Sequence, residues 1–164
     1  MPAPTTTLHL LCGKVAAGKS TLAARLASAP LTVLLSEDDW LFHLYGPEMQ
    51  TIADYARCSR RLRQPMGRHI ETLLRAGLSV VLDFPANTIA NRRWMRRLFE
   101  NAGAAHCLHY LDVPDDICQA RLKRRNEAGT HLFTVSEAEF TAITGYFEPP
   151  TASEGFQMET HYAV

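Results

Sequence analysis

The sequence predicts an α/β fold, a three-layer sandwich in which helices cover both faces of a five-stranded parallel sheet. Short, uninterrupted apolar runs alternate with helical segments, which is the pattern of parallel strands buried on both faces. The 164 residues are 46% hydrophobic and 21% charged, values that are ordinary for one soluble globular domain. We find neither an internal repeat nor a linker, so we expect a single domain over residues 1–164.

The expected strands are five apolar runs. They cover residues 8–12, 31–35, 78–82, 106–111 and 156–162. We expect residues 31–35 to form a buried strand, as residues 8–12 do. Ligands of open parallel sheets bind at the carboxyl ends of the strands. The polar residues found at these ends are Gly13, Asp38, Asp83 and Asp112.

Helices are expected between the strands. We place them at residues 19–27, from about 48 to 76, at 91–101, after Pro114 and after Ser136. Pro65 should kink or divide the long second helix, and Gly77 is placed to end it. Ser136 with Glu139 forms a capping box for the last helix.

The most specific motif follows the first expected strand. The residues Gly13-Lys14-Val15-Ala16-Ala17-Gly18-Lys19-Ser20 match G-x-x-x-x-G-K-[ST] at every required position. Glycines at both ends let the backbone wrap around a phosphate with its N–H groups pointing inward. The helix that begins at Lys19 adds free N–H groups and the positive end of its dipole. The motif predicts a P-loop that binds ATP.

The parts of this loop have expected roles toward ATP and Mg²⁺. Lys19 can reach the β and γ phosphates, and the Ser20 hydroxyl can coordinate Mg²⁺. Asp83 ends the third expected strand and can hold a Mg²⁺-bound water, so Ser20 and Asp83 are the candidate metal-site residues. We expect the loop to contact the nucleotide through Gly13, Lys14, Ala16, Ala17, Gly18, Lys19, Ser20 and Thr21.

Among P-loop proteins, the sequence favours the kinases. A motor-type ATPase needs an acidic residue that activates water beside the strand-end aspartate, but Phe84 follows Asp83. A GTPase recognises guanine through an Asn-Lys-x-Asp sequence, which this sequence does not contain. The expected fold is therefore the P-loop NTPase fold of the kinase type, and the expected reaction moves the γ-phosphate of ATP to a hydroxyl group.

A kinase also needs a base, arginines and a lid. Asp38 and Asp39 follow the second expected strand, where a carboxylate can accept the proton of the acceptor hydroxyl. We take Asp38 as the base, and the residues alone leave Asp39 open. Arg121 and Arg125 stand at i and i+4 of an expected helix, so they share one face. The candidate catalytic residues are Asp38, Lys19 and Arg125, and the lid is expected at about residues 121–135.

The chain resembles the small P-loop kinases grouped with chloramphenicol phosphotransferase and the zeta-toxin kinases, which have a nucleoside-monophosphate-kinase-like fold. The resemblance rests on residues 11–21, 35–40, 80–83, 111–114, 121–126 and 147–150. It implies that Asp38 is the general base, that Arg121 stacks on adenine and that Arg125 contacts phosphate. It also implies that residues 147–150 border the adenine pocket.

Most of these residues also have a purely structural interpretation. Asp38 and Asp39 can cap a helix that begins near Trp40, Asp83 can be a turn residue, and arginines often lie on solvated helix faces. We favour the solvated interpretation for the sets Arg57, Arg60, Arg61, Arg63, Arg68 and Arg92, Arg93, Arg96, Arg97. Asn87, His43 and Tyr45 are candidates for contact with the acceptor.

The amino-acid composition indicates which partners and which cellular location to expect for this protein. Seventeen basic residues balance seventeen acidic ones, which argues against a nucleic-acid partner. The four cysteines and seven histidines show no metal-ligand spacing, so we expect packed thiols in a reducing cytoplasm. No apolar run approaches a membrane span. The expected partner is a hydroxyl-bearing small molecule, such as an antibiotic or a metabolite, and the oligomeric state stays open.

Two other functions remain open at this point. One is a toxin-like kinase that phosphorylates a nucleotide sugar. The other is a nucleotide-binding regulatory module that hydrolyses ATP slowly and signals through a partner. The missing acidic residue after Asp83 and the acidic residues after the second strand favour phosphoryl transfer over hydrolysis.

Overall fold

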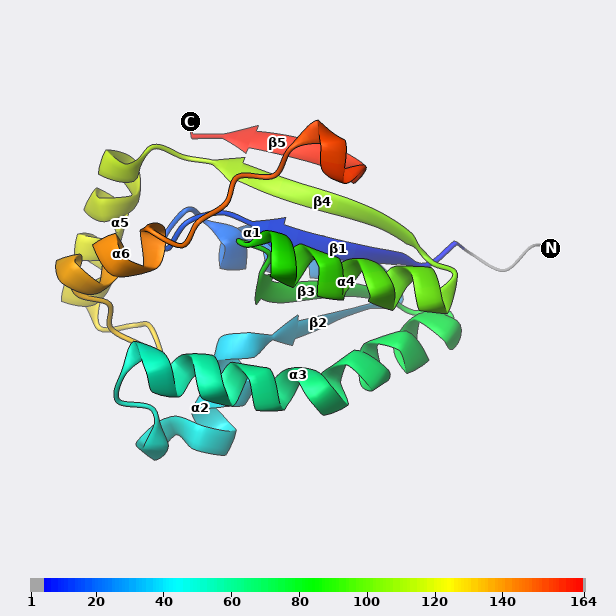
Figure 1. The fold of residues 1–164 in the computed structure, drawn as a ribbon, viewed down its shortest axis with the longest axis horizontal. Coiled ribbons are helices and arrows are strands. Elements are labelled where there is room, and N and C mark those ends of the chain that lie inside the picture. The colour runs from blue at the N-terminus through cyan, green and yellow to red at the C-terminus, as the bar shows by residue number, and fades with distance from the viewer. Residues whose placement is uncertain (1–4, 164) are drawn as a thin grey trace.

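The computed structural model describes residues 5–163, and its fold is the expected three-layer sandwich (Figure 1). Five parallel strands form one sheet in the order β2-β3-β1-β4-β5. The strands are β1 (Thr7–Cys12), β2 (Thr32–Ser36), β3 (Ser79–Pro85), β4 (Ala105–Asp112) and β5 (Met158–Tyr162). Because β1 is central, the segment after it emerges between the ends of β3 and β4.

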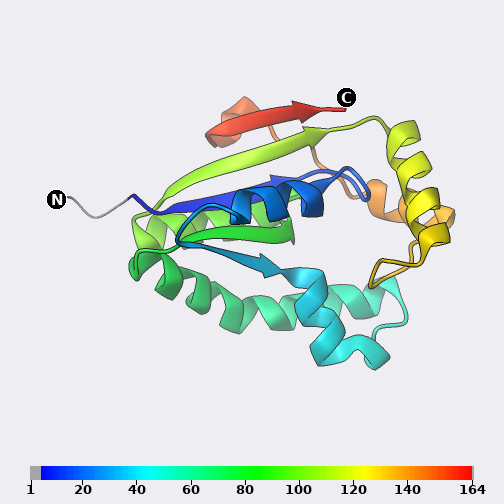
Figure 2. The same cartoon turned by 180° about the vertical axis from the view of Figure 1, so that it is seen from behind.

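Helices cover both faces of this sheet. They are α1 (Lys19–Ala27), α2 (Glu37–Tyr45), α3 (Ile52–Arg75), α4 (Ile89–Ala102), α5 (Asp115–Ala128) and α6 (Glu137–Thr144), with short 3₁₀ turns at Gly46–Glu48 and Ala152–Glu154. Figure 2 shows α1 on one face, with α3 and α4 on the other. The helices α5 and α6 stand beyond the carboxyl ends of the strands. No helix within residues 5–163 combines the length and apolarity needed to cross a membrane.

The two faces of the central strands build two apolar cores, because alternate residues point to opposite sides. Leu10 and Leu82 belong to the core under α3 and α4, while Leu11 and Val81 pack with Leu22 of α1. Each fully buried side chain of this size stabilises the fold by about 1.5–3 kcal/mol. This packing on both faces holds the carboxyl ends of the strands in fixed positions.

The long helix α3 differs from the sequence prediction in where it begins and how it passes Pro65. It begins at Ile52 rather than near Glu48, because Thr51 and Asp54 form a capping box. Pro65 does not divide α3. Pro65 lies on the exposed side, where water can satisfy the carbonyl that loses its helical partner. The helix ends as expected before Gly77, which has a φ of +90°.

Two strands also differ from the prediction. β2 was expected to be buried, but it is an outer strand of the sheet, and Leu34 is 40% exposed. β3 continues to Pro85, so Asp83 lies inside the strand rather than at its end. The pairing of β3 with β1 shifts after Leu82, since Leu11 is opposite Pro85. On this side the register passes over Asp83 and Phe84, whereas Asp83 still pairs with Ser36 of β2.

Candidate active site

The P-loop connects β1 to α1 and depends on its two glycines. A Cβ atom on Gly13 would lie 3.1 Å from Leu111 Cβ and 3.2 Å from Ala17 Cβ, so the loop has no room for a side chain there. Gly18 has a φ of +105°, which favours glycine. Ala16 also has a positive φ, of 62°, although this region costs an L-residue about 1–2 kcal/mol. Such strain is typical of segments shaped for a ligand.

Asn87, in the segment between β3 and α4, holds the start of this loop. Its Oδ1 accepts a hydrogen bond from the Gly13 N–H at 2.9 Å, and its Nδ2 donates to the Gly13 carbonyl at 2.8 Å. The sequence suggested Asn87 as a contact for the acceptor. The structure instead commits its amide group to positioning the P-loop.

We expect Asn87→Ala to lower both the thermal stability and the ATP affinity. The substitution leaves the N–H of Gly13 without its partner, which costs about 1–3 kcal/mol for a buried group. It also removes one of the two donors to the Gly13 carbonyl, the other being Lys19. Thermal unfolding and calorimetric ATP titration measure the two effects. Asn101→Ala is the matched control, because Asn101 bonds Glu71 in an exposed position. Equal behaviour of the two variants would contradict this role for Asn87.

Lys19, Ser20 and Asp83 lie together at the start of α1. Lys19 Nζ donates to the carbonyls of Gly13 at 2.5 Å and Lys14 at 2.8 Å, and Ser20 Oγ donates to Asp83 Oδ2 at 3.0 Å. Burial lowers the pKa of Lys19 and raises the pKa of Asp83, while the attraction between the two groups opposes both shifts. Hydroxyl and carboxylate oxygens are the ligand types that Mg²⁺ prefers.

A cavity of about 1250 Å³ runs along the carboxyl ends of the strands. It is large enough for a nucleotide and a second small molecule, since sites for drug-sized ligands occupy about 300–1,000 Å³. Its walls include the P-loop from Lys14 to Thr21, Asp38, Asp83 and the two arginines Arg121 and Arg125. Gly13 is not part of this lining. The cavity therefore gathers the other predicted site residues from four separate parts of the chain.

The structure separates Asp38 from Asp39. Helix α2 begins at Glu37, and its N-cap is Ser36, whose hydroxyl accepts from the Asp39 N–H at 3.3 Å. The interpretation of the two aspartates as caps of a helix near Trp40 is therefore wrong. Asp38 lines the cavity and accepts a hydrogen bond from Tyr55 at 3.0 Å. The side chain of Asp39 is 61% exposed and lies 3.5 Å from His43.

Glu37, next to Asp38, is a buried acid. It is 1% exposed, and its Oε1 accepts a hydrogen bond from the Ser59 hydroxyl. Its Oε2 has no hydrogen-bond partner among residues 5–163. Burial raises the pKa of Glu37 to about 7, against the opposing charge of Arg63.

This raised pKa predicts a pH-dependent stability. The folded protein holds the Glu37 proton more tightly than the unfolded chain does, where the pKa is 4.5. The contribution of Glu37 to stability is therefore greatest below that value and is lost as the pH rises from about 4.5 to about 7. Glu37→Gln cannot ionise. The melting temperature of this variant, relative to that of the unaltered protein, should therefore rise as the pH increases from about 4.5 to about 7. A constant difference between the two melting temperatures would contradict the prediction.

The two arginines of α5 reach the site from its far end. Arg121 Nη1 donates to the Ala17 carbonyl at 3.2 Å, and both Arg121 and Arg125 line the cavity. Arg125 Nε is buried without a hydrogen-bond partner in the described part of the chain. Burial lowers the pKa of Arg125, and the charge of Asp38 opposes this shift. Arg124, on the same helix, is exposed.

The solvated interpretation of the other arginines is wrong for Arg92 and Arg63. Arg92 is fully buried, where it bonds both carboxylate oxygens of Glu154 and the carbonyls of Ala86 and Glu148. Arg63 lines the cavity, donates to Asn91 at 2.7 Å and lies over the ring of Trp94. Both arginines are held by acceptor groups from other segments of the chain. An amphipathic sequence pattern does not reveal such contacts.

Some residues that line the cavity were not predicted from the sequence, and two predicted residues do not line it. Tyr55, His131 and Phe133 line it, although no local motif marks them. His43 and Tyr45 do not belong to its lining. Of residues 147–150, Phe147 lines the cavity, and the Lys14 ammonium lies 5.8 Å from the centre of its ring.

Comparison with solved structures finds the same fold in several kinases. A protein from Chloroflexus aurantiacus assigned as a kinase aligns over 96% of this chain and 85% of its own, with 19% identity and a TM-score of 0.76. The APS kinase of Mycobacterium tuberculosis, solved with AMPPNP and APS, aligns over 97% of this chain and 89% of its own, with 21% identity and a TM-score of 0.61. A sugar kinase from Janibacter aligns over 97% of this chain and 86% of its own, with 16% identity and a TM-score of 0.62.

Sequence comparison identifies the family. No curated protein shows significant sequence similarity to the chain. The sequence profile of the family AAA_33, described as an AAA domain, matches residues 8–150, which include the P-loop, Asp38, Asp83, Arg121 and Arg125. The chain therefore belongs to the AAA domain family AAA_33, and its structural neighbours are P-loop kinases.

Proposed function

We propose that this protein is an ATP-dependent kinase that transfers the γ-phosphoryl group to a hydroxyl group of a small molecule. The observation that carries the proposal is the position of Asp38, whose carboxylate lines the same cavity as Lys19 and the Ser20–Asp83 pair. A carboxylate in that place can align an acceptor hydroxyl and take its proton. The shared fold of the neighbouring kinases supports the proposal.

In the proposed transfer, the acceptor oxygen forms a bond to the γ-phosphorus while its proton passes to Asp38. The bond from the γ-phosphorus to the β–γ bridging oxygen breaks, and ADP leaves. Lys19 and the P-loop N–H groups bind the β and γ phosphates, and Arg125 neutralises charge on the transferring group. The resemblance to chloramphenicol phosphotransferase and the zeta-toxin kinases supports these roles, and it implies that Arg121 stacks on the adenine.

Ser20 and Asp83 fit a Mg²⁺ ion that accompanies ATP. Their oxygens lie 3.0 Å apart and are hard donors of the kind that Mg²⁺ takes. When bound there, Mg²⁺ would offset the negative charge of the phosphates. The hydrogen bond from Ser20 keeps the Asp83 carboxylate turned toward the P-loop.

The environment of Asp83 favours transfer over hydrolysis. Its neighbour Phe84 is fully buried and stacks on Trp94, so the strand offers no second acid that could activate water beside Asp83. This observation counts against the alternative of a regulatory module that hydrolyses ATP slowly. A toxin-like kinase of a nucleotide sugar would use the same residues and differ only in the acceptor.

The test is a search for phosphorylated products across hydroxyl-bearing compounds. The library holds antibiotics, sugars, nucleotide sugars and a 5′-hydroxyl oligonucleotide, and mass spectrometry detects the gain of one phosphoryl group. We expect ADP release to rise only when a suitable acceptor is added. ADP release that never depends on an acceptor would support the regulatory alternative and overturn the proposal.

Residues 121–135 are the proposed lid, and a substitution of Arg125 tests whether the lid contributes to the reaction rate. We expect Arg125→Ala to lower kcat by about 10²–10³-fold, because loss of one donor to the transition state has effects of that size. ATP affinity should change less than kcat. Arg124→Ala is the matched control, since the neighbouring side chain is exposed. Equal losses in kcat and in ATP affinity for Arg125→Ala would count against this role.

A further inference from the structure

Three histidines, a cysteine and a glutamate meet on the α1 side of β1, β4 and β5. The strand register places His9 beside Cys107 and His109 beside Glu159. His161 follows Glu159 by two residues, so strand alternation puts it on the same face. The sequence showed scattered histidines without metal-ligand spacing. The pairing of strands distant in sequence brings them into one group.

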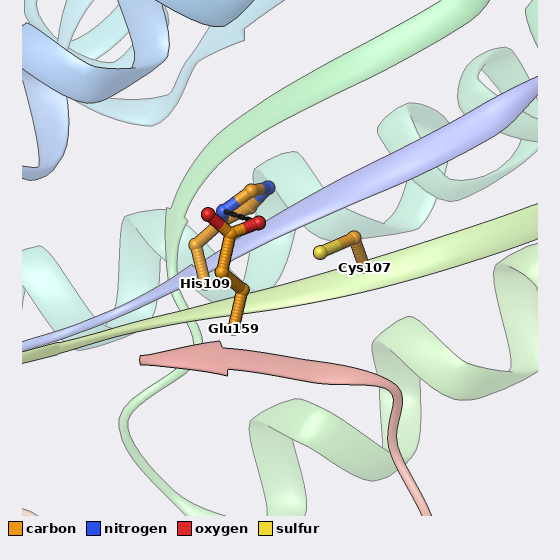
Figure 3. A group of neighbouring side chains, drawn as sticks. All are labelled: Cys107, His109 and Glu159. Atoms are coloured by element: carbon orange, nitrogen blue, oxygen red, sulfur yellow. Dashed lines mark ion pairs between the residues drawn. The ribbon is translucent and has the colours of Figure 1, made fainter. Parts of the chain in front are cut away.

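The donor atoms of this group are close together. His109 Nδ1 lies 3.9 Å from Glu159 Oε2 and 3.1 Å from His161 Nε2. His161 Nε2 lies 3.7 Å from Glu159 Oε1. Figure 3 shows Cys107, His109 and Glu159, which each offer a donor atom within 4.8 Å of the others. Donors bound tetrahedrally to one Zn²⁺ lie roughly 3.3–3.8 Å apart, so small side-chain rotations would bring them to one ion.

The hydrogen bonds of the group also suit a metal. His109 is 3% exposed, and its Nε2 lies 3.1 Å from His9 Nδ1. When Nε2 donates a hydrogen bond there, Nδ1 keeps the lone pair that a metal ion takes, as in many metal sites. A metal ion bound by Cys107 would displace the thiol proton.

We propose that these residues bind one Zn²⁺ ion. The ligands are Cys107 Sγ, His109 Nδ1 and a Glu159 carboxylate oxygen, with His161 Nε2 in the fourth position. Thiolate, imidazole and carboxylate donors together are typical of zinc, and two anionic ligands balance its charge. Because β5 is an outer strand and pairs with β4, an ion held by both strands fastens β5 to the sheet.

The experiment titrates Zn²⁺ into reduced protein without a histidine tag or nucleotide, in excess Mg²⁺ so that hard oxygen sites are occupied. We expect one Zn²⁺ per chain, and we expect Cys107→Ser and Glu159→Gln each to weaken its affinity by at least about tenfold. His69→Gln is the control, because His69 is exposed on α3. Circular dichroism without metal verifies that each variant folds.

Co²⁺ in place of Zn²⁺ gives a second readout that depends on the thiolate. The unaltered protein should show a thiolate-to-cobalt charge-transfer band, and Cys107→Ser should lose it. Zn²⁺ should also raise the melting temperature of the unaltered protein but not that of Cys107→Ser. Absence of zinc binding, or zinc affinity that is the same in Cys107→Ser and the unaltered protein, would overturn the site.

Discussion

Asp38→Asn should lower acceptor phosphorylation by about 10²–10⁴-fold, the usual effect of removing a general base, while ATP affinity changes little. The substitution keeps the size of the side chain and its ability to accept the hydrogen bond from Tyr55. It removes the charge and the site that takes the acceptor proton. Steady-state phosphorylation of an identified acceptor and calorimetric ATP titration measure the two quantities.

Asp39→Asn is the built-in control for this experiment. Asp39 is the next residue of the same helix, but its side chain lies outside the cavity lining and near His43. Its substitution should leave the reaction rate nearly unchanged. A larger loss in Asp39→Asn than in Asp38→Asn would mean that the other aspartate is the base. Normal rates in both variants would place the base elsewhere in the cavity.

Lys19→Ala should weaken ATP binding and nearly abolish transfer without unfolding the protein. The buried phosphates would lose a charge-assisted partner, which costs about 2–5 kcal/mol and lowers ATP affinity about 30-fold or more. The transition state would lose the same cation, so kcat should fall by roughly a further 10²–10³-fold. Calorimetry gives the affinity, and initial rates at saturating ATP give kcat.

Lys14→Ala is the matched control, because both lysines belong to the same loop. Lys14 Nζ pairs with Asp115 at 2.5 Å, and the Asp115 side chain is 55% exposed. Pairs of this kind contribute about 0–1 kcal/mol to stability, and the substitution keeps the backbone N–H groups of the loop. Lys14→Ala should therefore lower ATP affinity much less than Lys19→Ala does. Unchanged ATP affinity and turnover in Lys19→Ala would refute the assignment of this loop as the phosphate site.

The sequence predicted the parts of this molecule that local chemistry decides. The bounds of α1, Lys19–Ala27, match the prediction because the P-loop glycine and Ala29-Pro30 limit the helix on both sides. The central strands were found because a strand buried on both faces is mostly apolar along its length. The same rule misplaced β2, whose apolar residues resemble those of a central strand although it lies at the edge.

What the sequence missed depends on contacts between distant segments. Tyr55 reaches Asp38 only because α3 packs beside α2. Asn87 bonds Gly13 across 74 residues, and no local pattern distinguishes it from a solvated loop residue. The histidines of β1, β4 and β5 are separated in the same way. Strand order, which a single sequence does not encode locally, decides these neighbours.

Arg92 makes one side of the cavity rigid before any nucleotide arrives. Its guanidinium ties the end of β3 to the segment after α6, through the Ala86 and Glu148 carbonyls and the Glu154 carboxylate. Ordering a flexible residue costs about 1–2 kcal/mol in backbone entropy, and a preorganised wall avoids that cost on binding. The side of the cavity formed by Pro85, Asn87, Thr88 and Asn91 therefore adds little to the entropic cost of ligand binding.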